Sequence, residues 1–195
     1  MKTPNHYNRQ IIGALAIAIA LFTPALSHAQ SAPGPSLKPK IYLGGGVAPI
    51  ASPDSLKDDY KSKFTLFGAV GLELTPGLEA RFVVHYNDYD WSNKLQALQG
   101  QDPNQKYTMI GADLKWALLP KPSPVRPYFL AGAGSMTSSN DLVPDESNFY
   151  VNGGGGVDVK LGPSFAAFAE MKYVILNTSG EATALLPLIF GIRIL

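Results

Sequence analysis

A hydrophobic pattern with a period of two residues runs from Lys40 to the end of this sequence, and it restricts the possible folds severely. The period is that of a β-strand, because successive side chains of a strand point to opposite faces. Turn residues interrupt the pattern at regular intervals. We predict eight strands of about ten residues or slightly more. They span 40–50, 64–74, 78–88, 106–119, 126–137, 148–161, 164–176 and 183–195.

The connections between these strands alternate in length. The short ones contain proline or glycine, which favour tight turns; they lie at 75–77, 120–125 and 162–163. The longer ones are polar and lie at 51–63, 89–105 and 138–147, and a shorter one follows at 177–182. This alternation is typical of membrane barrels with tight periplasmic turns, and a β-sandwich has no reason for it. We therefore expect an all-β, eight-stranded antiparallel up-and-down transmembrane β-barrel.

Charged residues within the predicted strands share one face. Where two occur in one strand they lie two positions apart, as Glu79 and Arg81 do, so both project from the same side. We predict that this face lines the lumen and carries a neutral network of five acids and five bases. Its members are Glu73, Glu79, Arg81, Asp113, Lys115, Asp158, Lys160, Glu170, Lys172 and Arg193.

The opposite face is apolar, and a soluble lipocalin-like barrel or sandwich would bury it and expose the charges instead. Two features favour lipid outside and charge inside. Aromatic residues lie near strand ends on the apolar face, as in an interfacial girdle: Phe64, Tyr86, Trp116 and Tyr173. Small residues on the charged face leave room for long side chains in a narrow tube: Ala69, Gly71, Gly111, Gly132, Gly134, Gly154 and Gly156.

The first 29 residues have the features of a cleavable signal peptide. Lys2 and Arg9 form a positive start, the run 11–22 is apolar, and Ser27 and Ala29 offer the small residues at a cleavage site. A membrane-anchoring helix is the alternative, but the apolar run of about a dozen residues is shorter than the roughly 20 that a span needs. We expect a signal peptide over 1–29, a flexible periplasmic lead-in over 30–39 and the barrel over 40–195.

Other motifs predict no catalytic, cofactor or metal site. The chain has no cysteine, which excludes disulfides and thiol chemistry, and its net charge of +1 gives no attraction for nucleic acid. The glycine run 153–156 lacks the Lys-Ser/Thr of a phosphate loop. His85 is the only histidine after residue 29, so we expect it to pack in the lumen. We expect Tyr89 and Trp91 to belong to the aromatic girdle.

Several segments resemble the eight-stranded outer-membrane barrel families, the OmpA transmembrane-domain and OmpX-like group. They are KIYLGGGVAPI, ELTPGLEARFVVHY, RPYFLAGAG, NGGGGVDVKLGPSFAAFAEMKY and the final PLIFGIRIL. The chain ends on Ile194-Leu195, whereas members of these families usually end on an aromatic residue. The resemblance implies a monomer in the outer membrane, in contact with lipid and lipopolysaccharide. It also implies periplasmic chaperones and the barrel-assembly machinery as partners during biogenesis.

The expected function is a structural role in envelope integrity, or a surface interaction through loops outside the cell, and an adhesin would extend that role. A narrow, low-conductance pore is one alternative. Eight strands leave a lumen that side chains fill, so little conductance is expected. A lipid A-modifying enzyme is the other alternative. It would need a converging serine, histidine and carboxylate, and no serine lies two positions after His85.

The signal-peptide interpretation predicts that the envelope-associated protein begins at Gln30. Export would remove 1–29, since Ser27 and Ala29 occupy the positions that the peptidase inspects. Mass spectrometry of the N-terminus measures this directly. Retention of Met1 in the envelope fraction would contradict the prediction.

Overall fold

A computed structural model describes residues 38–52, 60–91, 105–119, 122–140, 143–176 and 183–194. Every regular element in these ranges is a strand. The strands are β1 (Pro39–Val47), β2 (Ile50–Ser52), β3 (Tyr60–Thr75), β4 (Leu78–Trp91), β5 (Gln105–Ala117), β6 (Val125–Asn140), β7 (Val143–Lys160), β8 (Phe165–Leu176), β9 (Thr183–Leu185) and β10 (Leu188–Ile194). The predicted signal peptide and nearly all of the predicted lead-in lie outside the described residues.

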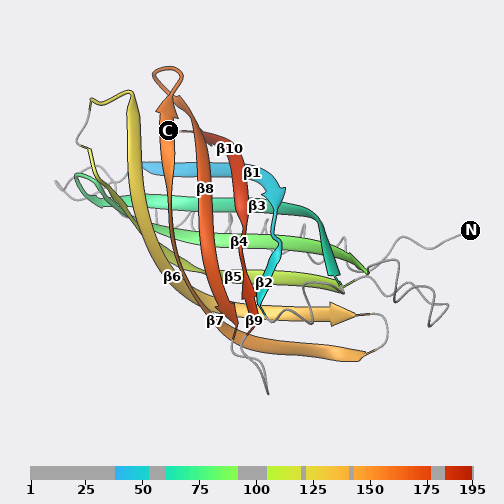
Figure 1. Ribbon diagram of the computed structural model, residues 1–195. Helices are drawn as coiled ribbons and strands as arrows, with labels where there is room; N and C mark the ends of the chain where they lie inside the picture. Colours follow the sequence, from blue (N-terminus) through green and yellow to red (C-terminus); the bar gives the residue numbers. More distant parts are fainter. Residues whose placement is uncertain are drawn as a thin grey trace, which may run out of the picture. The chain divides into compact units, whose positions relative to one another are not determined.

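The strands close into an antiparallel barrel (Figure 1). From β3 to β8, each strand pairs with the next along the chain. The ring is closed by β1, which pairs with β3 on one side and with β10 on the other, while β10 also pairs with β8. The short strands β2 and β9 pair with each other and continue β1 and β10. The wall therefore has eight strand positions, as the sequence predicts.

Two prolines split the first and last predicted strands. The predicted strand 40–50 breaks at Ala48-Pro49 into β1 and β2, and 183–195 breaks at Leu186-Pro187 into β9 and β10. Proline has no N–H to donate to the ladder, so a strand rarely passes through it unbroken. The two breaks face each other, and the Leu186 amide donates to the Pro49 carbonyl at 2.9 Å. The closing seam thus keeps a backbone hydrogen bond where its ladder is interrupted.

The tight connections lie where the sequence places them. Pro76 and Gly77 join β3 to β4, and Gly77 has a φ of 92°, a conformation that glycine adopts without strain. The Gly77 carbonyl accepts from the Ala117 amide at 2.8 Å, which ties this turn to the end of β5. Residues 161–164 join β7 to β8 at the same end of the barrel. We call this the tight-turn end, and the opposite end the loop end.

Three predicted loops at the loop end are shorter than expected. β3 already begins at Tyr60, β4 continues to Trp91, and the β6–β7 hairpin extends to Asn140 and Val143. The prediction failed because it assumed that strands stop where apolar alternation stops. Ladder hydrogen bonds are made by the backbone, so a hairpin continues through polar side chains once its register is fixed. Residues 53–59, 92–104, 141–142 and 177–182 lie outside the described ranges.

Side chains alternate between the two faces as predicted. The predicted girdle residue Trp116 is 65% exposed, and Leu114 on the same strand is 53% exposed. Their neighbours in sequence, Asp113 and Lys115, are buried. The Phe64 and Tyr86 rings lie 5.9 Å apart on the outer face of β3 and β4. The apolar surface therefore points out of the barrel, and the charges point in.

No helix in the described ranges has the length and apolar character needed to cross a membrane.

If the apolar face contacts lipid, a charge placed on it should destabilise the barrel. We expect Leu114→Arg, between Trp116 and Ile110 on the outer face, to lower the free energy of unfolding in lipid vesicles by about 2–4 kcal/mol. Ser147→Arg is the matched control, because Ser147 lies on the exposed polar extension of β7. It should cost about 0–1 kcal/mol. Equal stability of the two variants in a denaturant titration would contradict the assignment of the faces.

Candidate functional site: the charged lumen

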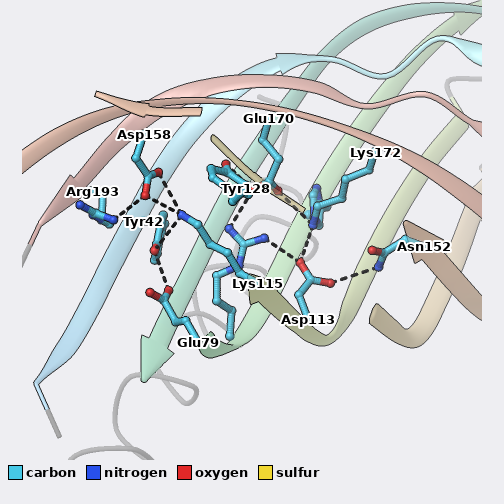
Figure 2. Close-up of polar contacts among 12 residues, drawn as sticks. Tyr42, Glu79, Asp113, Lys115, Tyr128, Asn152, Asp158, Glu170, Lys172 and Arg193 are labelled. Carbon is cyan, nitrogen blue, oxygen red and sulfur yellow. Dashed lines mark hydrogen bonds and ion pairs between the residues drawn. The ribbon is translucent and has the colours of Figure 1, made fainter. Parts of the chain in front are cut away.

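The lumen holds a network of buried ion pairs, and Asp113 on β5 is one of its centres (Figure 2). Its carboxylate accepts from Arg81 on β4 at 3.0 Å, from Lys172 on β8 at 2.7 Å and from Asn152 on β7 at 3.1 Å. Arg81 is directly opposite Asp113 in the β4–β5 register, but Lys172 reaches Asp113 from β8, three strands further round the wall. One carboxylate therefore connects four strands.

Glu170 on β8 is the second acid that Arg81 engages. The Arg81 Nη1 donates to Glu170 at 2.8 Å, and the Tyr128 hydroxyl donates to the same oxygen at 2.9 Å. Lys172 lies 3.3 Å from the other Glu170 oxygen. The side chains of Arg81, Asp113 and Glu170 have no solvent exposure. A charge this deeply buried is tolerated only when partners compensate it, and here each acid has more than one.

A second group of ion pairs lies nearer the tight-turn end. Asp158 accepts from Lys115 at 2.8 Å and from Arg193 at 2.5 Å. Glu79 accepts from Lys40 and from the Tyr42 hydroxyl, both at 2.6 Å. Lys115 connects the two sets of contacts, because its Nζ lies 3.3 Å from the Tyr42 hydroxyl and 3.8 Å from the centre of the Tyr128 ring. The ammonium over an aromatic face is a favourable cation–π arrangement.

Small residues make space for these side chains, as the sequence predicts. A Cβ added to Gly132 would overlap the Asp113 carboxylate, and one added to Gly111 would overlap the Tyr150 hydroxyl. In both cases the added Cβ would lie much closer to its neighbour than the van der Waals contact distance. Glycine at these two positions is therefore a condition for the charged and aromatic side chains to occupy the lumen.

Eight of the ten residues predicted for the network are buried inside the barrel. They are Glu79, Arg81, Asp113, Lys115, Asp158, Glu170, Lys172 and Arg193. Glu73 is partly exposed and pairs with Lys40 at 3.0 Å. Lys160 lies two positions after Asp158, on the predicted face of β7. It is exposed at the tight-turn end, because it is the last residue of that strand. Lys160 lines the cavity there, and its membership of the network stays a prediction.

Sequence analysis missed several residues of the network. Lys40 supplies the base that Glu73 and Glu79 contact, and its even spacing from Tyr42 would have placed it on the inward face. Three neutral residues lie an even number of positions from a charged residue of the same strand, and so on the same face: Tyr42, Tyr128 and Asn152. Charge alone does not reveal them, because they are neutral donors that complete the coordination of buried carboxylates.

Two other residues test the facing predictions. His85 packs in the lumen as expected: it is 2% exposed, and its Nε2 lies 3.2 Å from Lys172 Nζ. Tyr89 does not belong to an outer girdle. It is fully buried, and its hydroxyl donates to the Ala48 carbonyl at 2.5 Å, so it points inward beside the proline break. The predicted girdle partner Trp91 has no described side chain.

The lumen changes from charged to apolar along its axis. At the loop end a cluster of buried apolar side chains fills it: Ala48, Ile50, Tyr89, Met109, Met136, Tyr150, Val174, Leu176 and Leu185. At the tight-turn end the charged side chains border an open cavity of about 300 Å³. Between the two, Arg81 and Lys172 are each 1% exposed. The lumen is thus a packed core over most of its length and opens toward the tight turns.

Comparisons with known proteins agree with this architecture. Residues 14–186 match the model of the outer membrane protein beta-barrel domain. Neisserial surface protein A is similar in structure, with a TM-score of 0.56 and 20% identity over 80% of this chain and 96% of that one. A major outer membrane protein from Thermus thermophilus has a TM-score of 0.53 and 12% identity, with 80% and 99% of the two chains covered. No curated protein matches the sequence significantly.

The family match covers most of the chain, and its span includes every strand from β1 to β9. The structures that resemble it are below 25% identity and support the fold alone. With its closed wall, apolar outer face and charged lumen, this chain belongs to the outer membrane protein beta-barrel family and resides in the outer membrane.

Proposed function

We propose that this protein is a structural and surface-interaction barrel, which supports the outer membrane and presents the connections at its loop end outside the cell. One observation carries the proposal: the network joins strands across the lumen. Arg81 to Glu170 joins β4 to β8, Lys115 to Asp158 joins β5 to β7, and Lys40 to Glu79 joins β1 to β4. The first contact reaches the opposite side of the ring, and the other two each pass over one intervening strand. Together they hold non-neighbouring strands at fixed distances, which suits a rigid support better than a conduit.

The two alternatives find less support. A low-conductance pore would need a continuous aqueous path. The buried cluster at the loop end and the fully buried Arg81, Tyr42 and Lys172 lie in the way. A lipid A-modifying enzyme would need a histidine that meets substrate. His85 is buried beside Lys172 inside the barrel, away from the lipid-facing surface. Neither feature favours transport or hydrolysis.

The remaining parts of the proposal follow from orientation in the membrane. The tight turns face the periplasm, where short connections of outer-membrane barrels lie, and the longer connections face outward. A signal peptide over 1–29 and a lead-in over 30–39 would place the N-terminus of β1 on the periplasmic side. Outer-membrane lipid and lipopolysaccharide surround a monomeric barrel. Periplasmic chaperones and the barrel-assembly machinery act during its insertion.

Removing one member of a buried ion pair should destabilise the barrel strongly. We expect Arg81→Ala and Glu170→Ala each to lower the free energy of unfolding by about 3–5 kcal/mol, because each variant leaves the buried network with one uncompensated charge. Lys63→Ala is the control. Lys63 pairs with Asp90 at 3.4 Å, and both side chains are nearly half exposed, so its loss should cost about 0–1 kcal/mol. Urea titrations of the refolded proteins measure the difference, and equal midpoints would refute a structural role for the network.

The orientation predicts which connections can be labelled on intact cells. An epitope tag after Gly100, between β4 and β5, or between Asp141 and Leu142, between β6 and β7, should bind antibody on whole cells. Loop insertions of this kind are tolerated because few buried contacts depend on them. A tag after Lys121, between β5 and β6, should be labelled only after the outer membrane is permeabilised.

The same experiment separates the competing topologies. A reversed barrel would exchange the labelling of the two ends, and a soluble periplasmic protein would hide all three tags until permeabilisation. The heat-modifiable gel mobility of each tagged protein serves as the control for correct assembly.

A further inference from the structure

The cavity at the tight-turn end is lined mainly by cations. Its walls include Lys40, Arg126, Asp158, Lys160, Arg193 and the connecting residues 122–124. Its volume is about 300 Å³. Four of these side chains are basic and one is acidic. In a chain with a net charge of only +1, this opening concentrates positive charge.

Two of the four cations have no acidic partner among the residues that the structure describes. Asp158 already accepts from Lys115 and Arg193, and Lys40 already engages Glu73 and Glu79. In the described part of the chain, neither Arg126 nor Lys160 has a carboxylate within ion-pair distance. The Arg126 Nε donates to the Leu119 carbonyl at 3.2 Å, which fixes the side chain and leaves its two Nη groups for another acceptor. Arg126 is only 8% exposed, so it is held at the wall of the cavity.

We propose that this cavity binds a phosphate-type oxyanion, with Arg126 and Lys160 as its principal contacts. A guanidinium with free Nη groups matches the paired oxygens of a phosphate, and the ammonium of Lys160 adds a flexible point charge. Lys40 and Arg193 add positive potential at the inner wall, where Asp158 is already neutralised. The Ser123 hydroxyl donates to the Val125 carbonyl at 2.7 Å, so it shapes the rim and is not a free donor.

The ligand could be a free anion or the head group of a lipid. Apolar side chains surround the same rim on the outer face: Leu119, Val125, Leu161 and Phe165 are all exposed. A phospholipid whose acyl chains lie against these side chains would bring its phosphate to the mouth of the cavity. Both sources present the same chemistry to Arg126 and Lys160, and the experiment below separates them.

The test is a ³¹P NMR titration of the refolded mature protein in nonionic detergent micelles at low ionic strength. Inorganic phosphate is one probe, and dihexanoylphosphatidylglycerol added to the same micelles is the other. We expect saturable binding by the parent protein. Arg126→Gln and Lys160→Gln should each weaken it by about tenfold, the effect of losing one charge-assisted hydrogen bond. Lys63→Gln removes an equal charge at the loop end and should leave binding unchanged.

Each outcome has a defined meaning. If both probes bind with this dependence, the site takes free oxyanions, and if only the lipid binds, its occupant is a head group; both support the proposal. Absence of saturable binding by either probe overturns it, as does equal weakening by Lys63→Gln, which would indicate a general charge effect. Lys160 is exposed, so Lys160→Gln should fold even if Arg126→Gln does not. Heat-modifiable mobility verifies that each variant is folded. The labelling of surface loops is independent of every one of these results.

Discussion

The hydrogen bonding between β1 and β10 is the interaction on which the rest of the structure depends. In a bilayer no water is present to satisfy the edge of an open sheet, so only a closed ring of strands is stable there. Seven pairs of residues, from Ile41 with Ile194 to Val47 with Leu188, make this closure. It sets the number of strands, and through that number it sets the width of the lumen. The prolines at 49 and 187 weaken the same seam only beyond these seven pairs.

A narrow lumen explains why its charges are arranged as they are. Eight strands leave space for side chains but little for water, so each ionised group must find its partners among the other walls. Asp113 and Glu170 share both Arg81 and Lys172, and Asp158 joins Lys115 to Arg193. The glycines at 111 and 132 have no side chain that would overlap Tyr150 and Asp113, so they leave room in the same narrow lumen. The paired charges and the glycines beside them both follow from the small width of an eight-stranded barrel.

Sequence periodicity predicted the wall of this barrel well, because one rule, the alternation of side chains, governs every strand. It placed Arg81 and Glu170 inside, but it could not pair them: parity gives the face of a residue, whereas partners across the lumen depend on how far each strand is shifted along its neighbour. Tyr89 shows a different error. It has the parity of His85, so alternation alone turns it inward, and the expectation of an aromatic girdle at strand ends overrode that rule. Lys160 shows a further limit: alternation gives the face of a residue but does not say where the wall ends, and Lys160 is exposed at that end.

The change from an apolar loop end to a basic tight-turn end follows from which charges can be compensated. Inside the wall five acids pair with five bases, and Lys40 is the fifth base. Every carboxylate of the network therefore already has a basic partner. Bases added beyond the network can then be tolerated only where water reaches them. Arg126 and Lys160 lie at such a position, at the open mouth of the cavity. The loop end has no comparable set of inward charges among its described residues, and apolar packing fills it. The network is neutral by itself, so the additional cations Arg126 and Lys160 make the mouth of the cavity positive. Cations that face the phosphate layer of a membrane are suited to bind anions.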